Sequence, residues 1–215
     1  MAHPYWPLVD LRLTVGDLTL RPVTEADLDG LAAVKPPDAE DDPSLPAHPH
    51  LDRASGRAVA LRQHYWRSLA GWSPDDWRLP LVAVRGDDFV GFQDVEAADF
   101  RRLRTIDSSS WVALPLRRQG IGKAMRLAVL ALAFEGLGAR FAETSAWHDN
   151  AASLGVSRSL GYLPNGSHRH TRGDGDDEMV YLRMPLEIWQ RRHGGHHGVR
   201  IENLTPAWYG AEPAG

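Results

Sequence analysis

The chain contains no cysteine. That absence excludes disulfides, zinc sites built on thiolates and a cysteine nucleophile, and it gives no sign of an oxidising compartment. No apolar run approaches the roughly 18 residues needed to span a bilayer. The opening residues, "MAHPYWPLVD", lack the basic and apolar regions of a signal peptide. The sequence therefore predicts a cytoplasmic protein without membrane association.

The chain also lacks a large excess of charge of either sign. The 24 Lys and Arg residues nearly balance the 28 Asp and Glu residues, for a net charge of −4. So small a negative excess argues against non-specific binding to nucleic acid or to an anionic membrane. Apolar residues are plentiful by contrast. The 215 residues are 43% hydrophobic, which suffices for one domain with a full core.

The apolar spacing alternates between the periods of strands and helices. Leu18 and Leu20 predict a strand that ends near Pro22, and Thr24 with Asp27 predicts the capped start of a helix. The further predicted elements are a loop over 36–55, a helix over 56–72, a hairpin over 77–97, a strand over 104–114, a helix that ends near 136–138, a strand over 139–147, a helix closed at 161 and two closing strands.

This order, β-α-α-β-β-β-α-β-α-β-β, combines an antiparallel meander with one β-α-β crossover. It predicts a single α/β (α+β) domain over residues 1–189, with a mixed, mostly antiparallel sheet of about six or seven strands and helices on both faces. Residues 190–215 are polar apart from one apolar patch and are expected to form a C-terminal tail.

Glycine and arginine gather in "LRRQGIGKAM", residues 116–125. Gly120 and Gly122 allow the main chain to approach a ligand closely. The helix that follows presents unpaired N–H groups and the positive end of its dipole. Arg117, Arg118 and Lys123 add positive charge. The segment therefore predicts an anion site, with phosphate as the expected ligand.

The spacing excludes two nucleotide motifs. A P-loop requires Ser or Thr where Ala124 stands, and a dinucleotide fingerprint requires a third glycine where Met125 stands. The pattern Arg-x-x-Gly-x-Gly over 117–122, with "NAASLGVSRSLGY" over 150–162, instead resembles the acetyl-CoA loop of the GCN5-related N-acetyltransferase (GNAT) superfamily. The second segment is similar to that of the ribosomal-protein N-terminal acetyltransferase branch.

The resemblance implies that acyl-CoA lies in an opening between two splayed parallel strands, here about 109–114 and 140–146. The backbone of the first strand would bind the pantetheine arm, and the glycine loop would hold the pyrophosphate. Asn150 would bond the pantetheine or thioester region, because an amide both donates and accepts. The residues implied in binding acetyl-CoA or another acyl-CoA are Trp111, Val112, Ala113, Arg117, Arg118, Gln119, Gly120, Ile121, Gly122, Lys123 and Asn150.

The resemblance also implies direct attack of a neutral primary amine on the thioester. Ser153 stands at the position of a general-acid serine in the family, with capping of its helix as the alternative role. Glu96 and Asp107 are the first candidates for the base, since family bases often come from these strands. Asp94 and Glu143 are further candidates, and deprotonation through water is also open.

Two other features receive a structural interpretation. Tyr162 is expected in the core, although a phenol is the acid in other GNAT branches. No metal is expected, because His193, His196 and His197 lack the spacing of a metal site.

The acceptor is expected to be a small-molecule amine or a protein or peptide N-terminus, bound between residues 24–72, with the 36–55 loop, and residues 161–185. Two alternatives remain: a GNAT-like enzyme that takes its acyl group from aminoacyl-tRNA, and a non-catalytic acyl-CoA-binding protein. The intact glycine loop and the negative net charge favour CoA over tRNA. The oligomeric state stays open, with a homodimer among the options.

Overall fold

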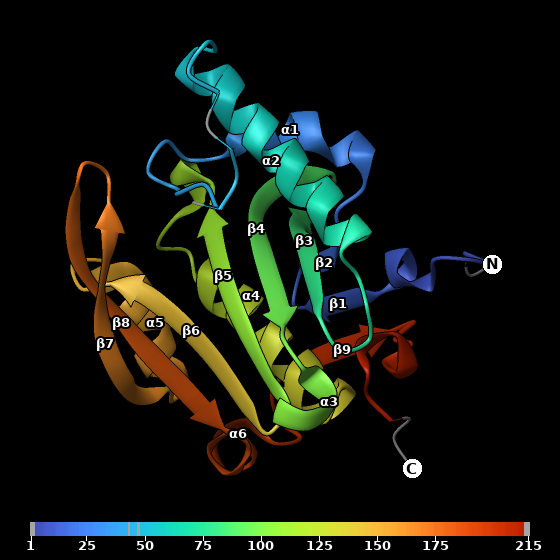
Figure 1. The fold of residues 1–215 in the computed structure, drawn as a ribbon. Helices are drawn as coiled ribbons and strands as arrows, with labels where there is room; N and C mark the ends of the chain where they lie inside the picture. The colour runs from blue at the N-terminus through green and yellow to red at the C-terminus, as the bar shows by residue number, and fades with distance from the viewer. Residues whose placement is uncertain (1–2, 43, 47, 213–215) are drawn as a thin grey trace.

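The computed structural model describes residues 3–42, 44–46 and 48–212, and one nine-stranded sheet dominates it (Figure 1). The strand order is β7-β8-β6-β5-β4-β3-β2-β1-β9, and every pair is antiparallel except β5–β6. The strands are β1 (Arg12–Val15), β2 (Leu18–Pro22), β3 (Trp77–Arg85), β4 (Asp88–Ala97), β5 (Thr105–Val112), β6 (Phe141–Trp147), β7 (Leu163–Arg172), β8 (Gly175–Pro185) and β9 (Val199–Glu202).

Helices cover both faces of the sheet, as the sequence predicts. One face carries the first two helices, and α4 and α5 lie together on the other (Figure 1). The helices are α1 (Leu28–Val34), α2 (Arg53–Ala70), α3 (Phe100–Leu103), α4 (Ile121–Ala131), α5 (Ala151–Leu160) and α6 (Leu186–His193), and a π-helical turn over Leu132–Gly136 extends α4.

Local chemistry explains where these elements begin and turn. The predicted capping box exists, with the Thr24 N–H and hydroxyl both donating to Asp27 Oδ2 at 2.8 and 2.7 Å. Gly86 takes a φ of +58° in the turn between β3 and β4, which confirms the predicted hairpin. The first helical turn of α5 is capped by Asn150, and Gly161 ends that helix at a φ of +107°.

The strand count exceeds the expected six or seven because two short strands, β1 and β9, join the sheet. Four residues of alternating character give a weak periodic signal, so neither segment was predicted. β9 lies inside the segment expected to be a tail. It pairs with β1 in antiparallel register, and the stretch before it continues as α6 to His193. Residues 190–202 are thus folded against the sheet.

Candidate active site

β5 and β6 begin side by side and then separate. They pair only where 105–107 face 141–143, and the Thr144 hydroxyl donates to Ser108 O at 2.9 Å just beyond. On its other edge β5 stays paired with β4 as far as Val112. Within the described residues no strand pairs with the β6-facing edge of β5 after this point. That edge therefore offers backbone donors and acceptors to an extended ligand.

The glycine loop stands at the open end of this gap, where α4 begins. Gly120 is the N-cap with a φ of +82°, and a Cβ there would meet no atom within 4 Å. The glycine thus serves a left-handed turn that leaves the helix end open to a ligand. Ile121 is 3% exposed and anchors the turn in the core. The loop residues that point to solvent are Arg118, Gln119 and Lys123.

Arg117 does not point freely to solvent. Its Nη1 and Nη2 donate to both carboxylate oxygens of Asp38 at 2.8 and 2.7 Å, and its Nε donates to Val112 O at 3.3 Å. The hydrogen bonds from Arg117 hold the pKa of Asp38 below its usual range. Asp38 belongs to the loop between α1 and α2, so this loop reaches the glycine loop at the start of α4. A pyrophosphate that binds Arg117 must compete with a carboxylate.

The other residues predicted to contact CoA are placed as follows. The Ala113 N–H donates to Val90 O at 3.0 Å, so strand pairing already uses it. Trp111 stacks on Phe92 with 5.7 Å between ring centroids. The Asn150 carbonyl oxygen accepts the Ser153 N–H at 3.0 Å, which leaves the Asn150 NH₂ group for a ligand. Ser153 thus follows the end of β6, in the first turn of α5.

A row of charged residues crosses the sheet where β5 and β6 are still paired. Arg78, Glu96, Asp107, Glu143 and Arg183 are register partners on five neighbouring strands. Arg78 pairs with Glu96, and the Nε of Arg183 donates to Glu143 at 2.6 Å. Asp107 stands between the two pairs. Burial, with the negative charge of Glu96, raises the pKa of Asp107 to about 7.

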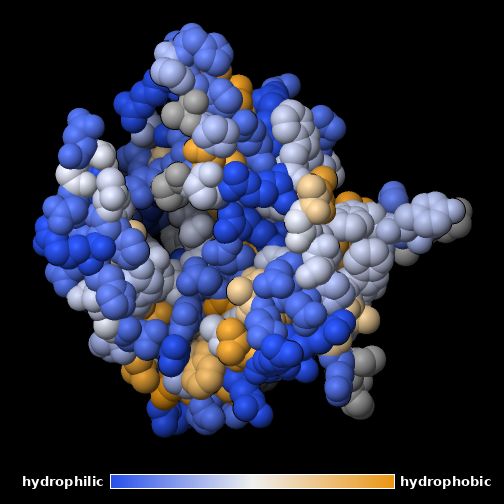
Figure 2. Space-filling model, viewed as in Figure 1, coloured by the Kyte–Doolittle hydropathy of each residue, from blue (hydrophilic) through white to orange (hydrophobic). Residues whose placement is uncertain are grey.

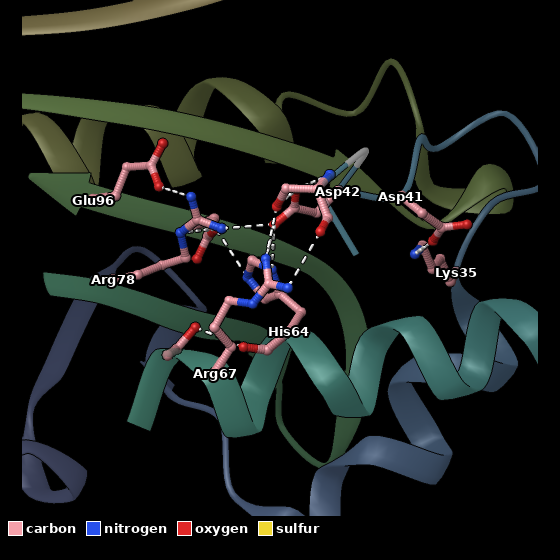
Figure 3. Close-up of polar contacts among 10 residues, drawn as sticks. Lys35, Asp41, Asp42, His64, Arg67, Arg78 and Glu96 are labelled. Carbon is pink, nitrogen blue, oxygen red and sulfur yellow. Dashed lines mark hydrogen bonds and ion pairs between the residues drawn. The ribbon is translucent and has the colours of Figure 1, made fainter. Parts of the chain in front are cut away.

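An ionic network joins this row to α2 and to the loop before it (Figure 3). Arg78 Nη1 lies 3.0 Å from Asp42 Oδ2. His64 Nε2 lies 3.0 Å from Asp94 Oδ2, and its Nδ1 lies 3.8 Å from Asp42. Asp94 is only 7% exposed, so His64 and Arg78 are its nearby polar partners in a buried position. Within the loop between α1 and α2, Asp42 thus contacts the α2 face and Asp38 contacts Arg117.

A cavity of about 580 Å³ lies beside the charged row, between α2 and the strands. The same face is hollowed towards the β7–β8 hairpin (Figure 2). Acidic residues outnumber basic ones in the cavity wall, whose charged members are Arg67, Asp76, Arg78, Glu96, Asp107 and Glu143. Three of the four predicted base candidates therefore meet at one cavity, and Asp94 lies in the network beside it.

Tyr162 and two of the C-terminal histidines, which were expected to have no role in metal binding or catalysis, make contacts within the fold. His193 contacts Leu160 O at 2.8 Å and His197 contacts Glu135 Oε2 at 2.8 Å. Tyr162 is 3% exposed. Sequence reasoning missed Arg126, a charged residue that is 3% exposed on α4. Its signal is a charged residue at a position where the spacing of apolar residues along α4 predicts the buried face. It also missed Asp38, whose partner lies far away in sequence.

The glycine loop, the parted parallel strands and the α5 cap together fit one family. The sequence model of the acetyltransferase (GNAT) domain matches residues 17–163, more than half of the chain. This chain belongs to the GNAT acetyltransferase family. The predicted family and enzyme class are therefore confirmed, and the acyl donor of this GNAT acetyltransferase is acetyl-CoA or another acyl-CoA.

Solved structures share the fold of this GNAT acetyltransferase. RimJ from Mycobacterium smegmatis, in complex with CoA-disulfide, aligns with a TM-score of 0.67 at 19% identity over 83% of this chain and 88% of its own. A chimera of spermidine N-acetyltransferase from Vibrio cholerae and hSSAT aligns with a TM-score of 0.63 at 12% identity over 82% and 100%. At such identities the likeness is one of fold.

The described residues of this GNAT acetyltransferase include no helix that is long and apolar enough to cross a membrane.

Proposed function

We propose that this GNAT acetyltransferase transfers the acetyl or another acyl group of acyl-CoA to a primary amine of a small molecule or of a protein or peptide N-terminus. Its donor end would be the α4 N-terminus, with Gly120 and the cations Arg117, Arg118 and Lys123 around the pyrophosphate. Its acceptor end would be the cavity over Asp107. The excess of carboxylates in that cavity favours a positively charged acceptor.

In the proposed reaction, Asp107 accepts the proton of the incoming ammonium group, because a base with a pKa near neutrality suits that task. The neutral nitrogen then forms a bond to the thioester carbon, and the carbon–sulfur bond breaks. Ser153 supplies a proton to the departing thiolate, as predicted from its place in the sequence, and it regains a proton through water from the second N–H that the acylated nitrogen loses as the amide forms. Glu96 is the second base candidate, but its carboxylate is already engaged in an ion pair with Arg78.

One observation carries this proposal. Asp107 lies at the last paired position of β5 and β6, so its carboxylate stands where the gap between the strands opens into the cavity. A ligand that extends from the glycine loop down this gap would present its reactive end to that carboxylate.

A thermal-shift series with CoA, acetyl-CoA and longer acyl-CoAs tests the donor, followed by detection of free CoA thiol with a panel of amines. A ligand that binds only the folded protein raises its melting temperature. At a free-ligand concentration a hundredfold above Kd, the free energy of unfolding rises by about 2.7 kcal/mol. We expect a shift with acyl-CoA and thiol release that depends on the amine. No shift with any of these compounds would disprove the proposal.

A further inference from the structure

Residues 38–40, in the loop between α1 and α2, form a strap with a contact on each side of the gap between β5 and β6. Asp38 accepts two hydrogen bonds, at 2.8 and 2.7 Å, from the guanidinium of Arg117, which follows β5. Glu40 accepts the indole N–H of Trp147, the last residue of β6, at 2.6 Å. In Figure 1 this loop lies at the arrowhead end of β5. The strap therefore lies where the two parallel strands have parted.

Arg117 joins the strap to the edge of β5 that faces the gap. Its Nε donates to Val112 O, on the last residue of β5, at 3.3 Å. The next residue, Ala113, donates its N–H to Val90 O on β4. Backbone groups of successive residues in a strand point to opposite edges, so the Val112 carbonyl faces the gap. Arg117 thus occupies a backbone acceptor on the edge that is offered to an extended ligand, and the Asp38 carboxylate occupies the guanidinium.

The middle and the β6 side of the strap have further contacts. Two Cα–Cα steps span at most about 7 Å, so the side chains of the strap and its partners complete the crossing. Arg57 on α2 donates to Ala39 O at 2.7 Å. Arg172 on β7 lies 3.9 Å from Glu40, and its guanidinium lies 4.9 Å from the centre of the Trp147 ring. These contacts remain when the contact on the β5 side is broken.

We propose that the strap is a gate on the donor slot. In the free protein, Asp38 holds Arg117 on the β5 side of the gap. Acyl-CoA enters when its pyrophosphate takes Arg117 from Asp38 and its pantetheine takes Val112 O from Arg117. The strap then moves away from β5 while Glu40 keeps its contact with β6. The inference rests on the donor end of the proposed function, and it adds that a segment of the acceptor side controls entry of the donor.

The absence of native cysteine allows either side of the strap to be locked by a cysteine pair. Asp38→Cys/Arg117→Cys, linked with a short bis-methanethiosulfonate, closes the β5 side. Glu40→Cys/Arg172→Cys, linked in the same way, closes the β6 side. Each pair capped with methyl methanethiosulfonate on both thiols is the matched control, because it carries the same substitutions without the link.

Isothermal titration with acetyl-CoA compares the four forms. We expect linked Asp38→Cys/Arg117→Cys to bind at least about tenfold more weakly than its capped form, because the link removes the open state. Linked Glu40→Cys/Arg172→Cys should match its capped form. Equal affinities of the linked and capped forms of Asp38→Cys/Arg117→Cys would overturn the inference, since acetyl-CoA would then pass a closed strap. An equal loss in both linked pairs would overturn the assignment of the β6 side as the fixed one.

Association kinetics test the gate with Arg117 in place. Asp38→Asn weakens the closed form, so we expect the association rate constant of acetyl-CoA to rise about threefold, while the dissociation rate constant stays nearly unchanged. The control Asp41→Asn removes the same charge from the same loop, where Asp41 pairs with Lys35. An unchanged association rate constant in Asp38→Asn, or an equal rise in Asp41→Asn, would contradict the gate.

The melting temperature of the wild type separates the two proposals. No rise with acetyl-CoA would refute the donor end of the proposed function and the gate with it. A rise in the wild type, together with a locked β5 side that still binds acetyl-CoA, would refute the gate alone.

Discussion

The two ends of the proposed site are built in opposite ways. The donor end is one continuous stretch, Arg117–Lys123, whose turn and charges follow from neighbouring residues. The acceptor end takes one residue from each of five strands, and its central carboxylate has no cation beside it in the row. A local motif binds a ligand class that many proteins share. A non-local set can be altered one strand at a time, which suits the part that selects the acceptor.

We expect the largest effect on activity from a substitution that disables only the acceptor end. Asp107→Asn removes the proposed proton acceptor while keeping its size, and we expect kcat/KM to fall by about a thousandfold. The CoA dissociation constant should stay unchanged, because Asp107 lies away from the glycine loop. The control is Asp88→Asn at the exposed start of β4, which should keep full activity. Equal losses in both variants would contradict the assignment.

The next largest effect should be a loss of CoA affinity in a variant that disables only the donor end. Gly120→Asp places a side chain and a negative charge at a position whose φ is +82°, so we expect CoA binding to weaken by about a hundredfold or more. The matched variant is Gly122→Ala, because a Cβ there meets the Val112 side chain at an ordinary 3.6 Å. Isothermal titration with CoA measures both, and a Gly120→Asp affinity equal to that of the wild type would show that this turn does not hold the pyrophosphate.

A smaller effect should appear in stability. The folded-state pKa of Asp107 is about 7 against an ordinary 3.8, so the folded protein binds more protons between these values and loses stability as pH rises through that window. Asp107→Asn removes the penalty. We expect it to stabilise the protein by about 2 kcal/mol at pH 8, roughly half of the full linkage value because the side chain is partly solvated. Urea unfolding should show this gain vanish near pH 4, and a gain independent of pH would contradict the pKa.

The smallest effect concerns the contact between the two regions. Asp38→Asn frees Arg117 from a carboxylate, so we expect CoA to bind up to about fivefold more tightly at low salt, within the range of an exposed ion pair. The control Asp41→Asn changes a residue of the same loop that pairs with Lys35 instead. If both variants bind CoA alike, the Asp38–Arg117 pair does not compete with the pyrophosphate.

The same contrast explains which features could be predicted from the sequence and which could not. The glycine loop, the hairpin around Gly86 and the Asn150 cap depend on neighbours in the chain, so their patterns predict them. Alternation places Glu96 and Asp94 on one face, but strand order alone brings Glu143 beside Asp107. Arg126 and Asp38 gain their meaning from contacts distant in sequence. β9 could not be predicted for the same reason, since its four residues form a strand only by pairing with β1.

The most direct measurement is the amine-dependent release of CoA thiol from acetyl-CoA, followed from pH 5 to 9 in the wild type and in Asp107→Asn. The account predicts release that requires an amine, with an acid limb near the Asp107 pKa of about 7 that disappears with the carboxylate. Tight acetyl-CoA binding without amine-dependent release, or an unchanged limb in Asp107→Asn, would contradict it.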